Sequence, residues 1–173
     1  GRIVTVNRVW LVLDVVQRGD RLTIEEQVCR IDVKSSVDLV RTRFPSAFLR
    51  AVSGTRRRAR LAWEGGRLRF RAPRKHVVHG AQLDDPERDA LPEDADDPRL
   101  VDPDGDGHPG MTIAIEGIAE GNIYVLQRAW SELAGNVTVS GDQATTIDGR
   151  IRWKSEQVIV DADNAFLMAS HAN

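Results

Sequence analysis

The alternation of apolar and polar residues predicts β-strands over most of the chain. Residues 3–16 are rich in Val, Leu and Ile, and Arg18-Gly19-Asp20 supplies a turn after them. In the next stretch the apolar residues occupy even positions up to Val28 and odd positions from Cys29 onward. Such a change of parity is typical of a β-bulge or a bent strand. The first part of the chain therefore predicts one long, bulged hairpin.

A second hairpin is centred on Gly65-Gly66. A two-residue loop there pairs Glu64 with Arg67, and continuing this register makes one side of the hairpin apolar and the other charged. We call the charged side the basic face, and its residues are Arg60, Arg67, Arg69 and Arg71. Because like charges on neighbouring strands repel, the basic face predicts an acidic partner.

The remaining pattern predicts a short helix, a long loop and more strands. A helix capped by Ser46 and ending at Val52 either covers one mouth of a barrel or forms a surface connection. The many Asp and Pro residues between Gln82 and Leu100 predict a long loop, within an acidic segment at 80–110. Further strands are expected at residues 112–118, 123–130, 137–139 and 147–160. The associated turn-forming groups stand at 120–122, 135–136, 140–142 and 148–149.

These elements predict an all-β single domain over residues 1–173, with about eight to ten antiparallel strands. We expect an up-and-down barrel, with a β-sandwich as the alternative. The long consecutive hairpins resemble the architecture of the calycins, although the G-x-W motif of the first lipocalin strand is absent. This resemblance implies a barrel that holds one apolar ligand. The candidate lining residues are Trp10, Trp63, Trp130 and Trp153.

Length and composition narrow the class of protein. A chain of 173 residues can bury a core without disulfides. Its single cysteine, Cys29, is expected to be a buried small hydrophobe rather than a nucleophile. There is no run of eighteen apolar residues, so we expect no transmembrane segment. Nothing in the sequence defines an oligomeric state.

Charge is separated along the chain, although the net charge is only −2. Residues 41–75 are strongly basic, with Glu64 as their single acid, whereas residues 84–106 are strongly acidic. Opposite charges this close in sequence attract each other. We therefore expect the acidic segment to lie loosely over the basic face and to close it to polyanions until a cation draws the carboxylates away.

The segment Asp102-Pro103-Asp104-Gly105-Asp106-Gly107 predicts a metal site. Three carboxylates at alternate positions, followed by glycine, can fold back on one hard cation that needs six to eight oxygen ligands. The segment resembles the calcium loops of the EF-hand and thrombospondin type 3 classes. This resemblance implies that Ca²⁺ binds Asp102, Asp104 and Asp106, together with a carbonyl near His108.

The match to an EF-hand is incomplete. Position twelve of the loop, where an EF-hand has a bidentate Glu, is Ile113, and the residues after it predict a strand instead of a helix. The remaining ligands would come from elsewhere in the chain. The nearest carboxylates in sequence are Glu116, Asp96 and Asp97. The alternative is a surface turn rich in Asp, Gly and Pro that holds no metal.

No catalytic motif stands out, because the chain has no nucleophile elbow, phosphate loop or paired zinc ligands. The first hypothesis is a non-enzymatic, calcium-stabilised protein that binds an apolar small molecule, a lipid or a surface partner. A loop without the bidentate Glu suits the millimolar calcium outside the cytosol, so we expect a secreted, periplasmic or cell-surface location. The alternative is binding of a polyanion, either an acidic glycan or nucleic acid, through the hairpin at 56–75. A third hypothesis is a calcium-dependent hydrolase.

Overall fold

The computed structural model describes residues 4–36 and 39–169 and confirms the all-β prediction. Eight antiparallel strands form one sheet in the order β1-β2-β4-β5-β7-β6-β3, and β8 pairs with the other edge of β7. The strands are β1 (Thr5–Arg18), β2 (Arg21–Ser35), β3 (Val40–Arg43), β4 (Thr55–Glu64), β5 (Arg67–His79), β6 (Met111–Gly117), β7 (Gly121–Ser140) and β8 (Gln143–Ala162). Two short helices are present, α1 (Ser46–Ala51) and α2 (Ala165–Ala169).

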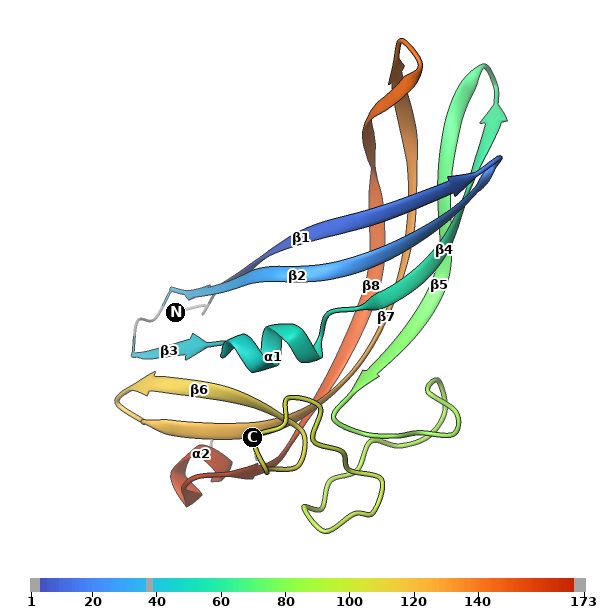
Figure 1. Cartoon of the computed structure of the whole chain (residues 1–173). Helices are drawn as coiled ribbons and strands as arrows, with labels where there is room; N and C mark the ends of the chain where they lie inside the picture. Colours follow the sequence, from blue (N-terminus) through green and yellow to red (C-terminus); the bar gives the residue numbers. More distant parts are fainter. Residues whose placement is uncertain (1–3, 37–38, 170–173) are drawn as a thin grey trace.

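Strand β7 joins the two ends of the molecule. It pairs with β8 from Ile123 to Ser140, while its other edge pairs first with β6 and then, from Gln127, with β5. Figure 1 shows the β7–β8 ribbon running from the lower end to the top of the molecule. Within the described residues, β1 pairs only with β2 and β8 only with β7, so the sheet curls without closing into a barrel. The pairing of β3 with β6 also departs from a strictly up-and-down order.

The β4–β5 hairpin confirms the predicted register, and the β1–β2 hairpin confirms the predicted bulge. Strands β4 and β5 pair Glu64 with Arg67, and the register continues without a shift to Arg60 and Arg71. The bulge in β2 falls at Cys29, because Trp10 pairs with Arg30 while the next residue pairs with Val28. Cys29 is exposed, however, so its predicted burial is wrong. The reason is that β4 pairs with β2 only over residues 21–26. Cys29 lies beyond the end of this pairing, outside the cluster around Phe70.

The predicted turns at 135–136 and 148–149 are wrong, because both glycine positions lie inside the long β7–β8 ribbon. Gly135 and Gly149 are cross-strand partners. A Cβ atom on Gly135 would lie 2.7 Å from the carbonyl oxygen of Asp148, and one on Gly149 would lie 2.7 Å from the Cα of Gly135. These glycines therefore permit a close approach of two backbones rather than a reversal of the chain.

The core consists of three small clusters. The first lies on β2, β4 and β5 around Phe70, and the second lies where Phe48 of α1 packs against Met111, Ile113 and Val125. Helix α1 begins after Pro45 without a side-chain cap, so Ser46 is its first residue and not its cap. The third cluster lies on the opposite face of β7, where the loop between β5 and β6 covers it. Its buried residues are Ala81, Tyr124, Leu126 and Val160.

The close approach in the β7–β8 ribbon gives a first prediction. Replacing Gly149 with Ala puts a methyl group into the backbone of β7, and we expect this overpacking to lower the free energy of unfolding by about 1–3 kcal/mol. The neighbouring substitution Asp148→Ala, at an exposed position, should change it by less than about 0.5 kcal/mol. Thermal or denaturant melts of both variants measure the difference. Equal melts would show that the two backbones do not approach closely.

Candidate metal centre and arginine groove

The acidic loop at 101–110 is closed at its base and fixed to the sheet. The amide of Gly110 donates to the carbonyl of Val101 at 2.8 Å, and the amide of Val101 donates to the carbonyl of Gly80 at 3.0 Å. Gly110 has φ of +85°, and a Cβ there would lie 2.9 Å from the carbonyl oxygen of Val125. The loop therefore begins against Gly80, directly after β5, and ends against β7, where only glycine fits.

Asp102 organises the backbone of this loop. Its Oδ1 accepts hydrogen bonds from the amides of Gly105 at 2.7 Å and Asp106 at 3.3 Å, and its Oδ2 accepts one from Gly107 at 2.8 Å. Desolvation raises the pKa of Asp102, but these backbone donors outweigh it, and the pKa lies below its ordinary value. The charged form of Asp102 is thus stabilised by the turn that the sequence predicts.

Asp104 and Asp106 both accept hydrogen bonds from Thr112, the second residue of β6. The amide of Thr112 donates to Oδ2 of Asp104 at 2.8 Å, and its buried hydroxyl donates to Oδ2 of Asp106. The other oxygen of Asp104, Oδ1, is buried and has no hydrogen-bond partner in the described part of the chain. Thr112 was missed by the sequence analysis, although its position directly after the loop was the available signal.

The three carboxylates converge on one point. One oxygen from each of Asp102, Asp104 and Asp106 lies within 4.8 Å of the other two. Burial raises the pKa of Asp104, and the charge of Asp106 raises it further. Carboxylates held this close repel one another, and a buried carboxylate oxygen without a partner is costly. The cluster has the charge and the oxygen donors that a hard cation requires.

His108 lies beside the cluster but its ring is already in contact with another side chain. It stacks on Tyr124 of β7, with ring centroids 4.2 Å apart and planes 11° apart. The hydroxyl of Tyr124 donates to Oδ1 of Asp163 at 2.6 Å, which lowers the pKa of that carboxyl, and burial followed by this hydrogen bond raises the pKa of Tyr124. This stacking holds the His108 ring against β7. The part played by Tyr124 and Asp163 was not predicted, because 39 residues separate them.

The other predicted calcium ligands do not join the cluster. Glu116 pairs with Arg43 at 2.7 Å, and Asp97 pairs with Arg99 at 2.7 Å, which lowers the pKa of Asp97 to about 2. Asp96 is exposed. Among the described residues, the triad of aspartates is therefore the only group of three that is placed to hold a metal ion.

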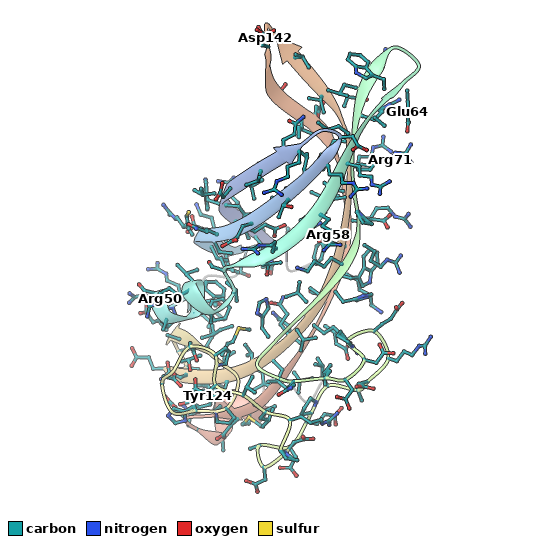
Figure 2. The ribbon with its side chains drawn as sticks, turned by 45° about the vertical axis from the view of Figure 1, so that its right-hand side comes forward. Arg50, Arg58, Glu64, Arg71, Tyr124 and Asp142 are labelled. Atoms are coloured by element: carbon teal, nitrogen blue, oxygen red, sulfur yellow. The ribbon has the colours of Figure 1, made fainter. Side chains whose placement is uncertain are left out.

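A second candidate site is a broad open groove of about 2150 Å³ on the sheet surface, lined by β1, β2, β4, β5, β7 and β8. Most of its lining residues lie on the same face of the sheet as Arg60 and Arg71. Eight arginines line it, against four acidic residues. These arginines are Arg18, Arg21, Arg56, Arg58, Arg60, Arg71, Arg150 and Arg152. Figure 2 shows Arg71 and Glu64 together on one side of the β4–β5 hairpin, where an ion pair of 2.9 Å joins them.

Five of these arginines form one row across the sheet, which we call the arginine row. The successive cross-strand pairs are Arg18 with Arg21, Arg21 with Arg60, Arg60 with Arg71, Arg71 with Ala134, and Ala134 with Arg150. At about 4.8 Å between neighbouring strands the row extends over about 24 Å. The predicted basic face lies on the same side of the sheet. Arg67 and Arg69 continue it toward the hairpin tip, outside the groove.

The four tryptophans do not come together. Trp63 is 72% exposed near the tip of β4, and Trp153 is 63% exposed on β8. Trp10 lies on β1 with Arg30 over its ring, and Trp130 lies under Arg74 at 4.1 Å. None of the four lines the arginine groove.

The acidic segment does not cover the basic face, which corrects the expectation of shielding. Residues 80–110 gather at the lower end of the molecule in Figure 1, away from the tip of the β4–β5 hairpin. Leu83 and Leu100 pack against the cluster around Tyr124 and Leu126, and Asp85 and Asp97 pair with arginines of their own segment. Burial of apolar side chains, and not the attraction between charges, therefore places this loop.

Comparison with protein-family models, with curated proteins and with solved structures gives no match for this chain. The resemblances to calcium loops and to calycins therefore stay predictions. Neither of the helices described is long and apolar enough to cross a membrane.

The contact between Thr112 and the aspartates gives a second prediction. Thr112→Val keeps the shape of the side chain but removes the hydroxyl that donates to Asp106, and we expect the metal-free protein to lose about 1–3 kcal/mol of stability. Thr112→Ser retains the hydroxyl and should lose less, and chemical denaturation in chelator compares the two. If the valine variant is as stable as the serine variant, the hydroxyl does not hold Asp106.

Proposed function

We propose that this protein binds an acidic polysaccharide in the arginine groove. We also propose that Ca²⁺ held by Asp102, Asp104 and Asp106 stabilises the end of the sheet that α1 and the acidic segment cover. The observation that carries the proposal is the arginine row, five like charges aligned across the sheet. An extracytoplasmic location follows from the weak, millimolar class of calcium site and from the kind of ligand.

The arginine row favours an external anion because ion pairs among the described residues neutralise only one of its five members. Directly opposed like charges on neighbouring strands destabilise a sheet. Arg71 pairs with Glu64, but no ion pair within the described residues involves the other four members of the row. These are Arg18, Arg21, Arg60 and Arg150. Guanidinium groups bind sulfate, phosphate and carboxylate with two parallel hydrogen bonds, so a polyanion relieves the repulsion and gains charge-assisted bonds.

The shape and the lining of the groove favour a polymer over a small molecule. Its volume of about 2150 Å³ exceeds the roughly 300–1,000 Å³ of usual small-molecule pockets, and it is open. No aromatic residue lines it, so the stacking on bases that single-stranded nucleic acid binding uses is not available there. An extended anionic polysaccharide needs neither stacking nor an enclosed pocket. The binding of an apolar ligand stays a prediction without a lined cavity to support it.

The proposal of Ca²⁺ is supported by the oxygen of Asp104 that lacks a partner. A cation at the point where the three carboxylates converge would satisfy this buried oxygen and offset the burial and the charge repulsion that raise the pKa of Asp104. Oxygen-only donors suit Ca²⁺ better than transition metals, which prefer nitrogen and sulfur. The ion would also fix the loop against β6 through Asp104 and Asp106.

Polyanion binding is tested with heparin as the acidic polysaccharide. The double substitution Arg21→Gln, Arg60→Gln removes two neighbouring members of the arginine row, and we expect the dissociation constant for heparin to rise by about tenfold at low salt. The control is Arg50→Gln, Arg88→Gln, which removes two arginines outside the groove; Figure 2 shows Arg50 on helix α1. Isothermal titration with a parallel titration of duplex DNA measures both.

Two results would count against this proposal. Equal losses in the two double variants would mean that overall charge, and not the groove, attracts heparin. Tighter binding of DNA than of heparin would assign the groove to nucleic acid. Because Arg21 and Arg60 lie far from the aspartate triad, the test does not depend on calcium.

Calcium binding is tested by thermal melts in Ca²⁺ and in chelator. Calcium at one hundred times its dissociation constant should add about 2.7 kcal/mol, a rise of roughly 5–10 °C in Tm for a domain of this size. Asp104→Asn keeps an acceptor for Thr112 but removes a charge, so we expect this variant to lose the calcium response. The matched control Asp96→Asn changes an exposed acid of the same segment and should keep it. An unchanged Tm of the native protein in calcium would contradict the metal site.

The pH dependence gives the same test an internal check. The pKa of Asp104 is raised on folding, so its contribution to stability is present at low pH and is lost as pH rises through that raised pKa. Asp102 has a lowered pKa and acts in the opposite sense, at lower pH. In chelator the stability should fall as Asp104 ionises, calcium should reverse the fall, and Asp104→Asn should not show it.

A further inference from the structure

Strand β1 is an edge strand that is apolar on both of its faces. Its large apolar residues from Val6 to Val16 are each 44–55% exposed, and they alternate between the two sides of the sheet. Natural edge strands are usually short or protected by proline, lysine or a bulge, whereas β1 has 14 residues with no proline or glycine. The unpaired backbone groups of such an edge form a template on which another strand can add.

The other edge strands of the described sheet have a different character. Strand β3 has only four residues, and two of them are arginines. Strand β8 carries Arg150, Arg152, Lys154 and Glu156 along one of its faces, so charged side chains protect it from pairing. Among these edges, β1 is the long strand whose central residues, 9–13, carry no charge.

The direction of the peptide groups defines how another strand can add to β1. The amide of Ser36 donates to the carbonyl of Val4 at 2.9 Å, and the amide of Val4 donates to the hydroxyl of Ser36, so the peptide groups of Val4 point toward β2. Because this direction alternates along a strand, the odd-numbered residues of β1 present their N–H and C=O groups at the open edge. Leu11 lies at the centre of this outward set.

We propose that two copies of this chain pair through β1, antiparallel about a two-fold axis at Leu11, and form one continuous sheet. In this register the residue numbers of each opposed pair sum to 22. Leu11 then lies opposite Leu11 of the second copy, and Val9 opposite Leu13, so that outward-facing residues meet outward-facing residues.

Charge complementarity selects this register. It places Arg8 of each copy opposite Asp14 of the other, on the same face of the sheet, and so forms two opposite-charge pairs. A shift by two residues in either direction opposes Arg8 to Val12 or to Val16 instead. Within the described chain neither Arg8 nor Asp14 forms an ion pair: across the β1–β2 pair Arg8 faces Asp32, which binds Arg30, and Asp14 faces the like-charged Glu25.

Disulfide trapping tests the two-fold axis. In a Cys29→Ser background, which removes the native thiol, Leu11→Cys should form an intermolecular disulfide under mild oxidation, because opposed Cα atoms in a sheet lie about 5.5 Å apart. Gln17→Cys is the matched control. It lies opposite Thr5 of the second copy, and the two introduced thiols would be about 40 Å apart. Cross-linking at Gln17 equal to that at Leu11, or none at Leu11, overturns the proposal.

Charge reversal tests the register. Arg8→Asp and Asp14→Arg each create like-charged pairs, and each should raise the dimer dissociation constant in sedimentation velocity by about tenfold. The double variant exchanges the charges and should restore the dimer. A native chain that stays at the monomer mass of 19.2 kDa at all concentrations overturns the proposal, as does a double variant no better than the singles. If a single variant has a lower melting temperature than the native chain, its dissociation constant is not used, and the disulfide result decides.

Discussion

The pairing of β7 with three different strands is the interaction on which the rest of the structure depends. Its first residues hold β6 and, through Val125 and Tyr124, the base of the acidic loop. Its later residues place Ala134 between Arg71 and Arg150 in the arginine row. The candidate metal centre and the candidate polyanion groove are therefore built on one strand, and disturbing its pairing with β8 would disturb both.

This arrangement leaves the sheet covered at one end only. Near Met111 and Leu126 both faces of the sheet are buried, one under α1 and the other under the acidic segment at 80–110. Beyond them the sheet is a single layer with a small cluster around Phe70 and long exposed edges. A single layer buries little apolar surface, so its stability depends more on what binds its faces and edges. The exposed positions of β1 and the unpaired arginines are two consequences of this one constraint.

Local patterns predicted the local structure well. Alternation and the Gly65-Gly66 turn were enough for the β4–β5 register, and the change of parity at Cys29 was enough for the bulge. The roles of the glycines were harder to predict. Gly135 and Gly149 stand beside Asn136 and Asp148, as turn glycines often do, but in the structure they lie where two backbones approach closely. The aspartate triad was visible because its spacing is local. The partners Thr112, Tyr124 and Asp163 depend on pairing between distant segments, which no single stretch encodes.

The bulge in β5 explains how one face of the sheet changes from charged to apolar. Up to Ala72 the odd-numbered residues of β5 share the face of the arginine row, and one extra residue before Lys75 reverses this parity. From there the even-numbered residues lie on that face, and Val78 packs under the acidic segment at 80–110. Arg74 lies at the change and covers the ring of Trp130 at 4.1 Å. Without the extra residue, the odd-numbered residues would stay on this face to the end of β5, and Val78 would turn away from the apolar cluster against which it packs.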